Sequence, residues 1–367
     1  MTHPRGRLAI GLLCLLVVAT GCDLVGASPV SSPTSPPASA AATTRPRRSQ
    51  PAATADVTGS AESTRRPRRP RGSPTPSVAP TATPAPTPPP TPMPPIAGLE
   101  QIAGADGRFT VLFLGSDARG DVIGERTDTI MVATIDPATG RVAMASLPRD
   151  TVNVPIADGD VYGSRITGLL QSFELGGADR EQALRRMTRA MATAFDIEID
   201  GYVLVGFVGV RRLIDAIGGV DVVLDQALWD TSMNHFSKKG LKLKAGRNHL
   251  DGSKALAFAR TRYTDSDYQR AERQQQLVMA TAAKVLQNGA EAVPALAELA
   301  LRHVETDLPL SALPLLVELA GRARLSGYKS VVLGPSTYAA AGPEQYTIEL
   351  RLDAVRAMFD RLFGSTG

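Results

Sequence analysis

The sequence contains very little cysteine and histidine. Its 367 residues include two cysteines, Cys14 and Cys22, and four histidines, none of which shows metal-ligand spacing. These shortages argue against a zinc site, a histidine-based hydrolase and a disulfide framework. The phosphate-loop, dinucleotide-binding, nucleophile-elbow and zinc-protease motifs are also missing. The chemistry of this protein must therefore rest on other residue types.

Aromatic residues are missing from the whole N-terminal part. The 9 Phe, 7 Tyr and 1 Trp all lie at or after Phe109, whereas most of the 28 prolines lie between Pro29 and Pro95. Residues 1–95 carry ten Arg against three acidic residues, while the whole chain has a net charge of +4. The remainder is therefore mildly acidic, which argues against a nucleic-acid-binding domain.

No apolar run is long enough to span a membrane as a helix. The longest one, Leu8–Gly21, has about fourteen residues, where roughly twenty are needed, and it follows a short basic segment. It ends in Ala19-Thr20-Gly21-Cys22, which resembles the lipobox of bacterial lipoproteins. We predict a lipoprotein-type signal peptide at 1–21 and lipidation of Cys22. An uncleaved anchor or a plain signal peptide with an incidental cysteine are the alternatives.

Residues 22–97 are predicted to form a disordered tether. They are rich in Pro, Ser, Thr and Arg, have no aromatic residue, and bury too little apolar surface to offset the entropy of ordering. The Arg clusters at 45–48 and 65–71 either touch anionic lipid or wall polymer or simply solubilise the spacer.

Residues 98–367 are predicted to form one α/β domain. Apolar runs predict strands at 109–115, 129–135, 141–147, 202–207, 220–224 and near Val331. Helical patterns cover 179–195, 208–217, 251–259, about 267–286, two Ala/Leu-rich segments and 352–363. Strands alternating with helices favour a three-layer arrangement.

Arginine and aspartate residues gather at the strand ends and on one helix. Asp117 follows the first strand, Arg126 and Asp128 begin the second, and Arg149 and Asp150 follow the third. Loops at strand ends are where α/β sheets hold ligands. Further along lie Arg260 and Arg262, which would point the same way if extended, and Arg270, Arg273 and Gln274, which share one helix face.

Together these residue types suit a pyrophosphate with a divalent metal. Guanidinium groups bind phosphate through paired donors, and carboxylates hold Mg²⁺ beside it. Individually, each Arg also fits a surface ion pair, Asp117 and Asp128 also fit turn caps, and Asp150 also fits a partner of Arg149. The spacing alone leaves both interpretations open.

The same segments resemble the LytR-CpsA-Psr family of bacterial cell-envelope proteins. The matching motifs occur in order over about 109–365, which is nearly the whole foldable region. They are Val111–Asp117, Arg126–Met131, Ser146–Thr151, Leu213–Val222, Leu250–Leu256, Ala259–Arg262 and Arg270–Gln276. Two features depart from the family pattern: Thr167 stands where Asn is common, and lipid on Cys22 is expected to serve as the anchor where many members have an N-terminal transmembrane helix.

The resemblance implies a fold and a reaction. The fold is a three-layer α/β/α sandwich with a central mixed sheet and a deep apolar pocket for a polyprenyl chain. The reaction moves a glycopolymer from a polyprenyl-pyrophosphate carrier to a peptidoglycan hydroxyl and forms a phosphodiester, at the extracytoplasmic face of the bacterial cell membrane. The family's Mg²⁺-associated (or Mn²⁺-associated) carboxylates match Asp117 and Asp128. Its pyrophosphate-contacting residues match Arg126, Arg149, Arg260, Arg262, Arg270, Arg273 and Gln274.

Two roles remain open at this point. Asp128 and Asp150 are equal candidates for the base that activates the acceptor hydroxyl, beside the central Arg149. The same site would also suit a non-catalytic receptor for the lipid-linked precursor, or a pyrophosphatase that uses water. Paired carboxylates beside the arginines favour catalysis, because an anion receptor has no need for them.

Overall fold

The computed structural model describes residues 92–117, 125–233, 239–262, 266–289, 293–335 and 337–363. The predicted signal peptide, Cys22 and most of the predicted tether lie outside these residues. Ile96 is 4% exposed and packs in the main core, so the folded part begins slightly before residue 98. None of the helices in the described ranges has both the length and the hydropathy of a membrane span.

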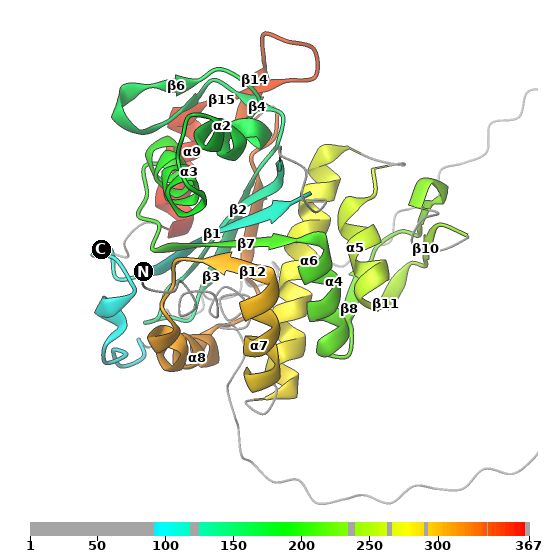
Figure 1. Cartoon of the computed structure of the whole chain (residues 1–367). Coiled ribbons are helices and arrows are strands. Elements are labelled where there is room, and N and C mark those ends of the chain that lie inside the picture. The colour runs from blue at the N-terminus through cyan, green and yellow to red at the C-terminus, as the bar shows by residue number, and fades with distance from the viewer. Residues whose placement is uncertain are drawn as a thin grey trace, which may run out of the picture. The chain divides into compact units, whose positions relative to one another are not determined.

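A six-stranded mixed sheet forms the centre of the fold (Figure 1). Its strands are ordered β12 (Val304–Thr306), β7 (Gly201–Gly206), β1 (Phe109–Ser116), β2 (Thr127–Ile135), β3 (Val142–Leu147) and β13 (Lys329–Val332). β1 pairs antiparallel with β2 and parallel with β7, and β3 pairs parallel with β13. The predicted mixed sheet is therefore confirmed.

Helices cover both faces of this sheet. Because side chains alternate along a strand, Leu112 and Leu114 of β1 face one layer and Val111 and Phe113 face the other. The first layer holds α2 (Leu169–Leu175), α3 (Arg180–Phe195) and α9 (Leu352–Phe363). The second holds α4 (Phe207–Ala216), α5 (Gly252–Arg260), α6 (Asp267–Asn288), α7 (Val293–His303) and α8 (Leu313–Arg322). This is the three-layer sandwich expected from the sequence.

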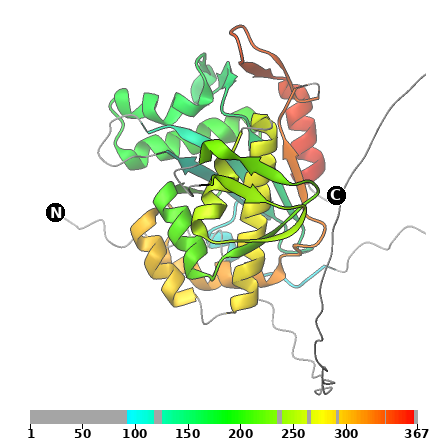
Figure 2. The ribbon, with the colours of Figure 1, turned by 90° about the vertical axis from the view of Figure 1, so that its right-hand side faces the viewer.

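Short strands form small sheets outside the central one. β8 (Val220–Leu224) has the predicted bounds but pairs with β11 (Gly246–Leu250), and β9 (Leu228–Asp230) pairs with β10 (Leu241–Leu243). Figure 2 shows these ribbons in front of the second helix layer. The remaining strands are β4 (Thr151–Val152), β5 (Val154–Pro155), β6 (Val161–Tyr162), β14 (Ala339–Ala341) and β15 (Ile348–Leu350).

The boundaries of the helices follow local sequence signals. Asp179 caps α3 by accepting a hydrogen bond from the Gln182 backbone N–H at 2.9 Å, as its position before the helix predicted. Phe207, expected to end a strand, instead begins α4.

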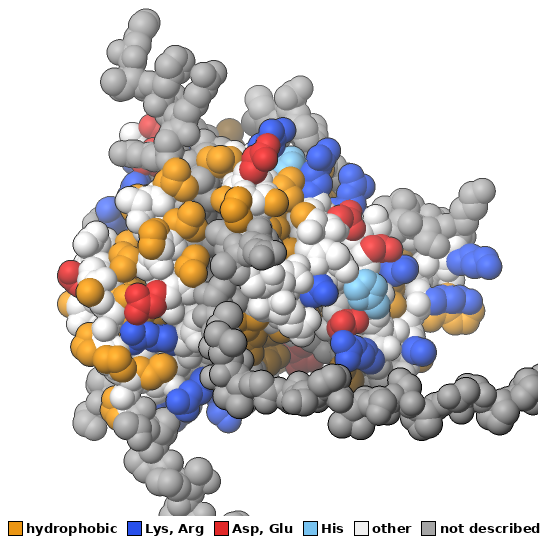
Figure 3. All heavy atoms as spheres, turned by 90° about the horizontal axis from the view of Figure 1, so that it is seen from below, with side chains coloured by type: hydrophobic (Ala, Val, Ile, Leu, Met, Phe, Trp, Pro, Cys, Tyr) orange, Lys and Arg blue, Asp and Glu red, His pale blue; other side chains and the backbone are white. Residues whose placement is uncertain are grey.

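On the face seen from below, Lys and Arg side chains gather mainly on the right, and apolar side chains on the left (Figure 3).

Candidate functional site

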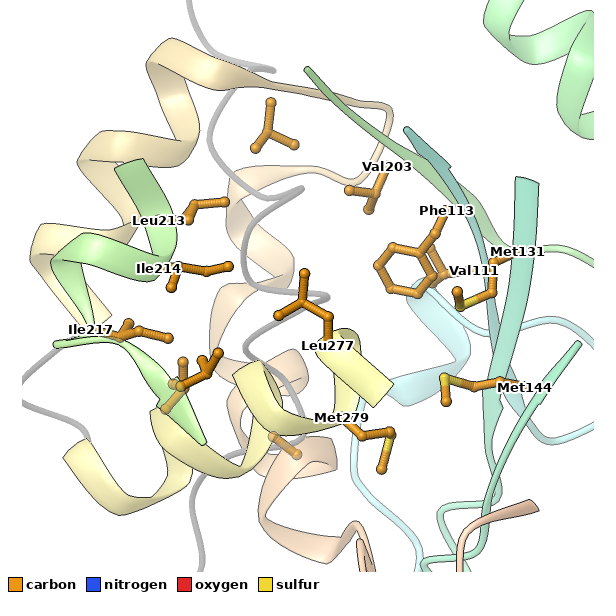
Figure 4. Packing of buried hydrophobic residues seen from close by; sticks show 14 of the residues in the cluster. Val111, Phe113, Met131, Met144, Val203, Leu213, Ile214, Ile217, Leu277 and Met279 are labelled. Carbon is orange, nitrogen blue, oxygen red and sulfur yellow. The ribbon is translucent and has the colours of Figure 1, made fainter. Parts of the chain in front are cut away.

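A cavity of about 480 Å³ lies between the sheet and the helices α4, α5 and α6. Its walls are mostly apolar. Figure 4 shows Phe113 and Met131 of the sheet facing Leu213 and Ile214 of α4, with Leu277 of α6 between them, and all five residues line the cavity. The apolar walls come from two strands and two helices that are far apart in the sequence. The fold therefore places an apolar space directly beneath the strand ends that carry the candidate site.

Charged side chains line the same cavity at one end. Six of the residues singled out in the sequence are among its lining: Asp128, Arg149, Arg260, Arg262, Arg270 and Gln274. This set has four guanidinium groups and one carboxylate, and Asp150 and Asp267 beside Arg149 bring the carboxylates to three, so the end of the cavity keeps an excess of one positive charge. An apolar cavity with a positive end suits an amphiphile whose head carries phosphate.

Asp128 owes its position to a β-bulge. Gly115 of β1 pairs with Thr129 and Ser116 pairs with Thr127, so Asp128 is the extra residue of β2. A bulge bends the strand and redirects the side chain of the extra residue. Asp128 is consequently able to line both the apolar cavity and a second, polar one described below.

Arg149 lies at the centre of a group of carboxylates. Its Nη1 donates a hydrogen bond to Asp128 Oδ1 at 2.9 Å. Its Nε lies 3.4 Å from Asp267 Oδ2 and 3.6 Å from Asp150 Oδ2. Burial alone would lower the pKa of Arg149, but these carboxylates, Asp128 foremost, leave it raised. Arg149 therefore stays charged at the junction of three acidic side chains.

Asp267 is a site residue that was not predicted from the sequence, where its position indicated only the start of a helix. Besides Arg149, its carboxylate contacts Arg262 Nη1 at 3.1 Å and Arg270 Nη1 at 3.4 Å. Burial would raise the pKa of Asp267, but the charges of Arg270, Arg149 and Arg262 hold it below its usual range. One sequence signal could have identified Asp267: it is an acidic residue at the start of a helix that also carries candidate phosphate ligands.

Asp150 behaves in the opposite way to Asp267. Burial raises its pKa, against the lowering charge of Arg149, and the neighbouring Asp267 carboxylate raises it further. Its other partner is Arg165, whose Nη1 lies 3.4 Å from Asp150 Oδ1. The two carboxylates thus have pKa values pushed apart, which is a common property of acid–base sites.

Arg270 carries a buried positive charge that its neighbours balance only partly. It is 6% exposed, and its Nε makes no hydrogen bond to any of the residues that the structure describes. Burial lowers its pKa; Asp267 opposes this, whereas Arg149 and Arg262 lower it further. A buried guanidinium at the cavity wall with a spare donor is a feature expected of an anion site.

Arg260 and Arg262 both line the cavity, but their expected geometry is only partly correct. Arg260 is the last residue of α5 rather than part of an extended segment, and its guanidinium lies 4.2 Å from the ring centroid of Phe207. Thr261, which follows, is extended and turns the chain towards Arg262. The end of a helix, rather than strand alternation, is what brings the two side chains to one cavity.

The expectation that Arg273 contacts phosphate is not supported by its placement. Arg273 is 8% exposed, and its guanidinium donates hydrogen bonds to the backbone carbonyls of Phe258 and Thr261. It does not line the apolar cavity, whereas Arg270 and Gln274 on the same helix do. The physical reason is that carbonyl groups at the end of α5 need donors, and Arg273 supplies them.

Asp117 and Arg126 lie beside the bulge. Asp117 Oδ1 accepts a hydrogen bond from the Arg126 backbone N–H at 3.0 Å, while the Asp117 N–H donates to the Arg126 carbonyl at 3.2 Å. Asp117 is therefore held at the end of β1, next to the strand that carries Asp128. The side chain of Arg126 is exposed and lines the polar cavity instead of the apolar one.

The polar cavity has a volume of about 500 Å³. It shares Asp128 and Arg149 with the apolar cavity and is otherwise lined by residues such as Asp150, Tyr162, Arg165 and Gln171. Thr167 also belongs to it, and its hydroxyl donates a long hydrogen bond to Asp128 Oδ1 at 3.5 Å. A polar contact thus exists at this position although the residue is Thr.

Comparison with known proteins identifies relatives of most of the folded region. The family model of the LytR_cpsA_psr family matches residues 94–332. The polyisoprenyl-teichoic acid–peptidoglycan teichoic acid transferase TagV of Bacillus subtilis is 32% identical over 209 residues, or 55% of this chain and 50% of that protein. A transferase of the same description, TagU of Halalkalibacterium halodurans, is 35% identical over 176 residues, or 47% of this chain and 51% of that protein.

The chain spans about half the length of these curated relatives. The crystal structure of B. subtilis TagV superposes with a TM-score of 0.56 at 25% identity, covering 72% of this chain and 100% of that one. The similarity therefore includes the arrangement of the elements as well as the motifs.

Proposed function

This chain belongs to the LytR-CpsA-Psr family, and we propose that it transfers a glycopolymer from a polyprenyl-pyrophosphate carrier to a hydroxyl of peptidoglycan. The new bond is a phosphodiester, and polyprenyl phosphate leaves. The names of the curated relatives, which are transferases that join teichoic acid to peptidoglycan, support this assignment.

One observation carries the proposal: an apolar cavity ends at a cluster of guanidinium groups. The apolar walls suit an isoprenoid chain, and Arg149, Arg260, Arg262 and Arg270 suit the pyrophosphate attached to it. Arg149 and Arg270 contribute most clearly, because the buried Nε of each lacks a hydrogen-bond partner among the described residues. A soluble sugar nucleotide would have no use for the apolar part.

Asp117 and Asp128 would hold a divalent cation, Mg²⁺ or Mn²⁺. Both lie at the paired ends of β1 and β2, and the buried hydroxyl of Ser116, the last residue of β1, has no hydrogen-bond partner in the described part of the chain. Two carboxylates suit Mg²⁺, since this ion commonly uses one or two carboxylates together with substrate phosphates. When bound, the ion would offset negative charge on the phosphate oxygens.

The chain's own residues then have separate tasks. The arginines orient the pyrophosphate and stabilise the charge of the phosphoryl group during transfer. Asp150 accepts the proton of the acceptor hydroxyl. We assign this task to Asp150 rather than Asp128 because Asp128 accepts a hydrogen bond from Arg149 at 2.9 Å and would hold the proposed cation. Asp150 has only longer contacts, 3.6 Å to Arg149 and 3.4 Å to Arg165, and burial raises its pKa, which makes its carboxylate more basic.

The anchoring of the protein is part of the same proposal. Lipid on Cys22 would hold the chain at the extracytoplasmic face of the cell membrane, and the Pro-rich segment after it would span on the order of 200 Å if fully extended. The domain would then reach both lipid-linked precursor and peptidoglycan.

Product analysis tests the reaction. The full chain is incubated with Mg²⁺, a polyprenyl-pyrophosphate-linked glycan and peptidoglycan fragments, and the products are identified by mass spectrometry. Polymer joined to peptidoglycan supports the proposal. Free sugar phosphate would indicate a pyrophosphatase, and unchanged lipid that stays bound would indicate a receptor; either result would contradict transfer.

A further inference from the structure

The polar cavity lies on the other side of Arg149 and Asp128 from the apolar cavity. More than half of its remaining lining residues come from β6, the short helical turn Ile166–Gly168 and α2. Leu169 and Leu170 of α2 pack with Leu114 on the first layer of the sandwich, whereas the apolar cavity is lined by α4, α5 and α6 of the second layer. Figure 1 shows these groups of elements on opposite sides of the sheet.

We propose that this polar cavity binds the acceptor sugar of peptidoglycan, so that donor and acceptor approach the phosphate from opposite sides. The inference rests on the proposed function and adds where the acceptor is held and by which residues. Neither the family match nor the names of the relatives assigns this cavity a role.

The geometry of phosphoryl transfer supports this placement. The attacking and leaving oxygens lie roughly in line on opposite sides of the phosphorus. The leaving group here is polyprenyl phosphate, whose chain occupies the apolar cavity. With the phosphate at Arg149 and Asp128, the in-line position for the attacking hydroxyl is the polar cavity that shares these two residues.

The same geometry argues against the donor's own glycan as the occupant. The glycan is attached to the phosphorus that is attacked, and in an in-line displacement this substituent projects sideways from the axis between the attacking and leaving oxygens. It would therefore leave the site towards solvent rather than into the cavity opposite the lipid.

The lining of the cavity is suited to a sugar. Tyr162 is half-buried, and the hydroxyl-bearing Ser164 and Ser172 line the same cavity. Gln171 adds an amide on the same side. Hydroxyl and amide groups donate and accept at once, as sugar hydroxyls do. The charged groups of the lining are matched in number, because Arg126, Arg149 and Arg165 stand beside Asp128, Asp150 and Glu344.

Arg165 lines the polar cavity and contacts two other segments of the chain. Its Nη2 donates to the Gln345 carbonyl at 3.2 Å, and its Nη1 lies 3.4 Å from Asp150 Oδ1. Asp150 lines the polar cavity but not the apolar one, so its carboxylate faces the acceptor side.

The step is balanced as follows. The acceptor oxygen forms a bond to the phosphorus that carries the glycan, and its proton passes to Asp150. The bond between that phosphorus and the bridging oxygen breaks, and its electron pair leaves with polyprenyl phosphate. No other reactant is required.

The test separates acceptor binding from donor binding. With the full chain in detergent, KM for the peptidoglycan fragment, KM for the lipid-linked glycan and kcat are measured for Tyr162→Phe and Gln171→Ala. Tyr328→Phe is the matched control, because Tyr328 is also a half-buried tyrosine but lines neither of the two cavities.

We expect each test variant to raise the acceptor KM by about 3- to 10-fold, as the loss of one neutral hydrogen bond does, with the donor KM within twofold of wild type and the control unchanged. An unchanged acceptor KM would overturn the inference. A rise in the donor KM alone would show that the cavity holds the donor's glycan, which also overturns it. If the wild type makes no joined product, the proposed function fails, and the acceptor site fails with it.

Discussion

The Nη1 atom of Arg149 lies 2.9 Å from Oδ1 of Asp128, at the place where the apolar and polar cavities meet. This contact joins the end of β3 to the bulge of β2. It holds a positive charge on the boundary between a lipid-sized space and a polar one. The reaction proposed for this protein requires a phosphate at that boundary.

Replacing Arg149 is expected to abolish turnover without unfolding the domain. Arg149→Ala removes a charge aimed at the phosphate, which should lower kcat by at least about 100-fold. Arg149→Lys should also lose most activity, because Lys cannot reproduce paired guanidinium contacts. The side chain is 21% exposed and outside the core, so circular dichroism should show a folded domain.

Arg180→Ala is the control for Arg149. Arg180 also contacts three carboxylates, those of Glu125, Glu174 and Glu305, but it lines neither cavity. This variant should lower the free energy of unfolding and leave kcat within about twofold of wild type. Equal loss of activity in the Arg149 and Arg180 variants would contradict the assignment.

Arg270 and Arg273 lie one turn apart on α6 and should respond in opposite ways. Arg270→Met should reduce turnover at least about tenfold while the free energy of unfolding stays equal or rises, because burial already disfavours this charge. Arg273→Met should reduce the free energy of unfolding by about 2 kcal/mol, since two backbone carbonyls lose their donor. Urea denaturation and steady-state kinetics on both variants check this. A loss of turnover with Arg273→Met and a loss of stability with Arg270→Met would contradict the assignment.

Filling the apolar cavity should weaken the binding of ligands that carry an isoprenoid chain and should not affect the binding of pyrophosphate without a chain. Val210 lines the cavity on α4, whereas Val208 on the same helix is 50% exposed. Val210→Phe should lower the affinity for geranylgeranyl pyrophosphate at least about fivefold and leave the affinity for inorganic pyrophosphate unchanged. Val208→Phe should change neither. Calorimetric titration of both ligands checks this, and equal effects of the two variants would argue against a lipid in the cavity.

Asp200 should make stability depend on pH. Burial raises the pKa of Asp200 to about 7, although its Oδ2 accepts a hydrogen bond from the Thr110 N–H at 2.7 Å. The folded chain thus holds a proton that the unfolded chain releases at lower pH, so the free energy of unfolding should fall as pH rises towards 7. Asp200→Asn should flatten this slope between pH 5 and pH 8 in urea denaturation. The same slope in both proteins would show that Asp200 is not the cause.

Much of the central fold was predictable from local patterns. β1, β2, β3 and α9 match the predicted segments to within two residues, because buried strands are continuous apolar runs and the final helix has a clear apolar stripe. α2 was not predicted, since it has only seven residues and follows a helical turn without a capping signal. The polar cavity depends on this short helix and on β6, which explains why the sequence did not indicate it.

The site was predictable in its residue types but not in every placement. Helical spacing correctly put Arg270 and Gln274 at the cavity, yet the same spacing could not show that the carbonyls of α5 would engage Arg273. Asp267 gains its importance from Arg149, which is more than a hundred residues away in the chain, and only the packing of α6 against β3 reveals that contact.

The fate of the donor's phosphorus tests the central claim most directly. A polyprenyl-pyrophosphate glycan carrying oxygen-18 on the non-bridging oxygens of the phosphorus next to the sugar is incubated with the full chain, Mg²⁺ and peptidoglycan fragments, and the label is followed by phosphorus NMR and mass spectrometry. We predict that it appears as a phosphodiester between polymer and peptidoglycan with the wild type and not with Arg149→Ala. Label found in a free phosphomonoester, or a diester formed equally well by Arg149→Ala, would contradict the account.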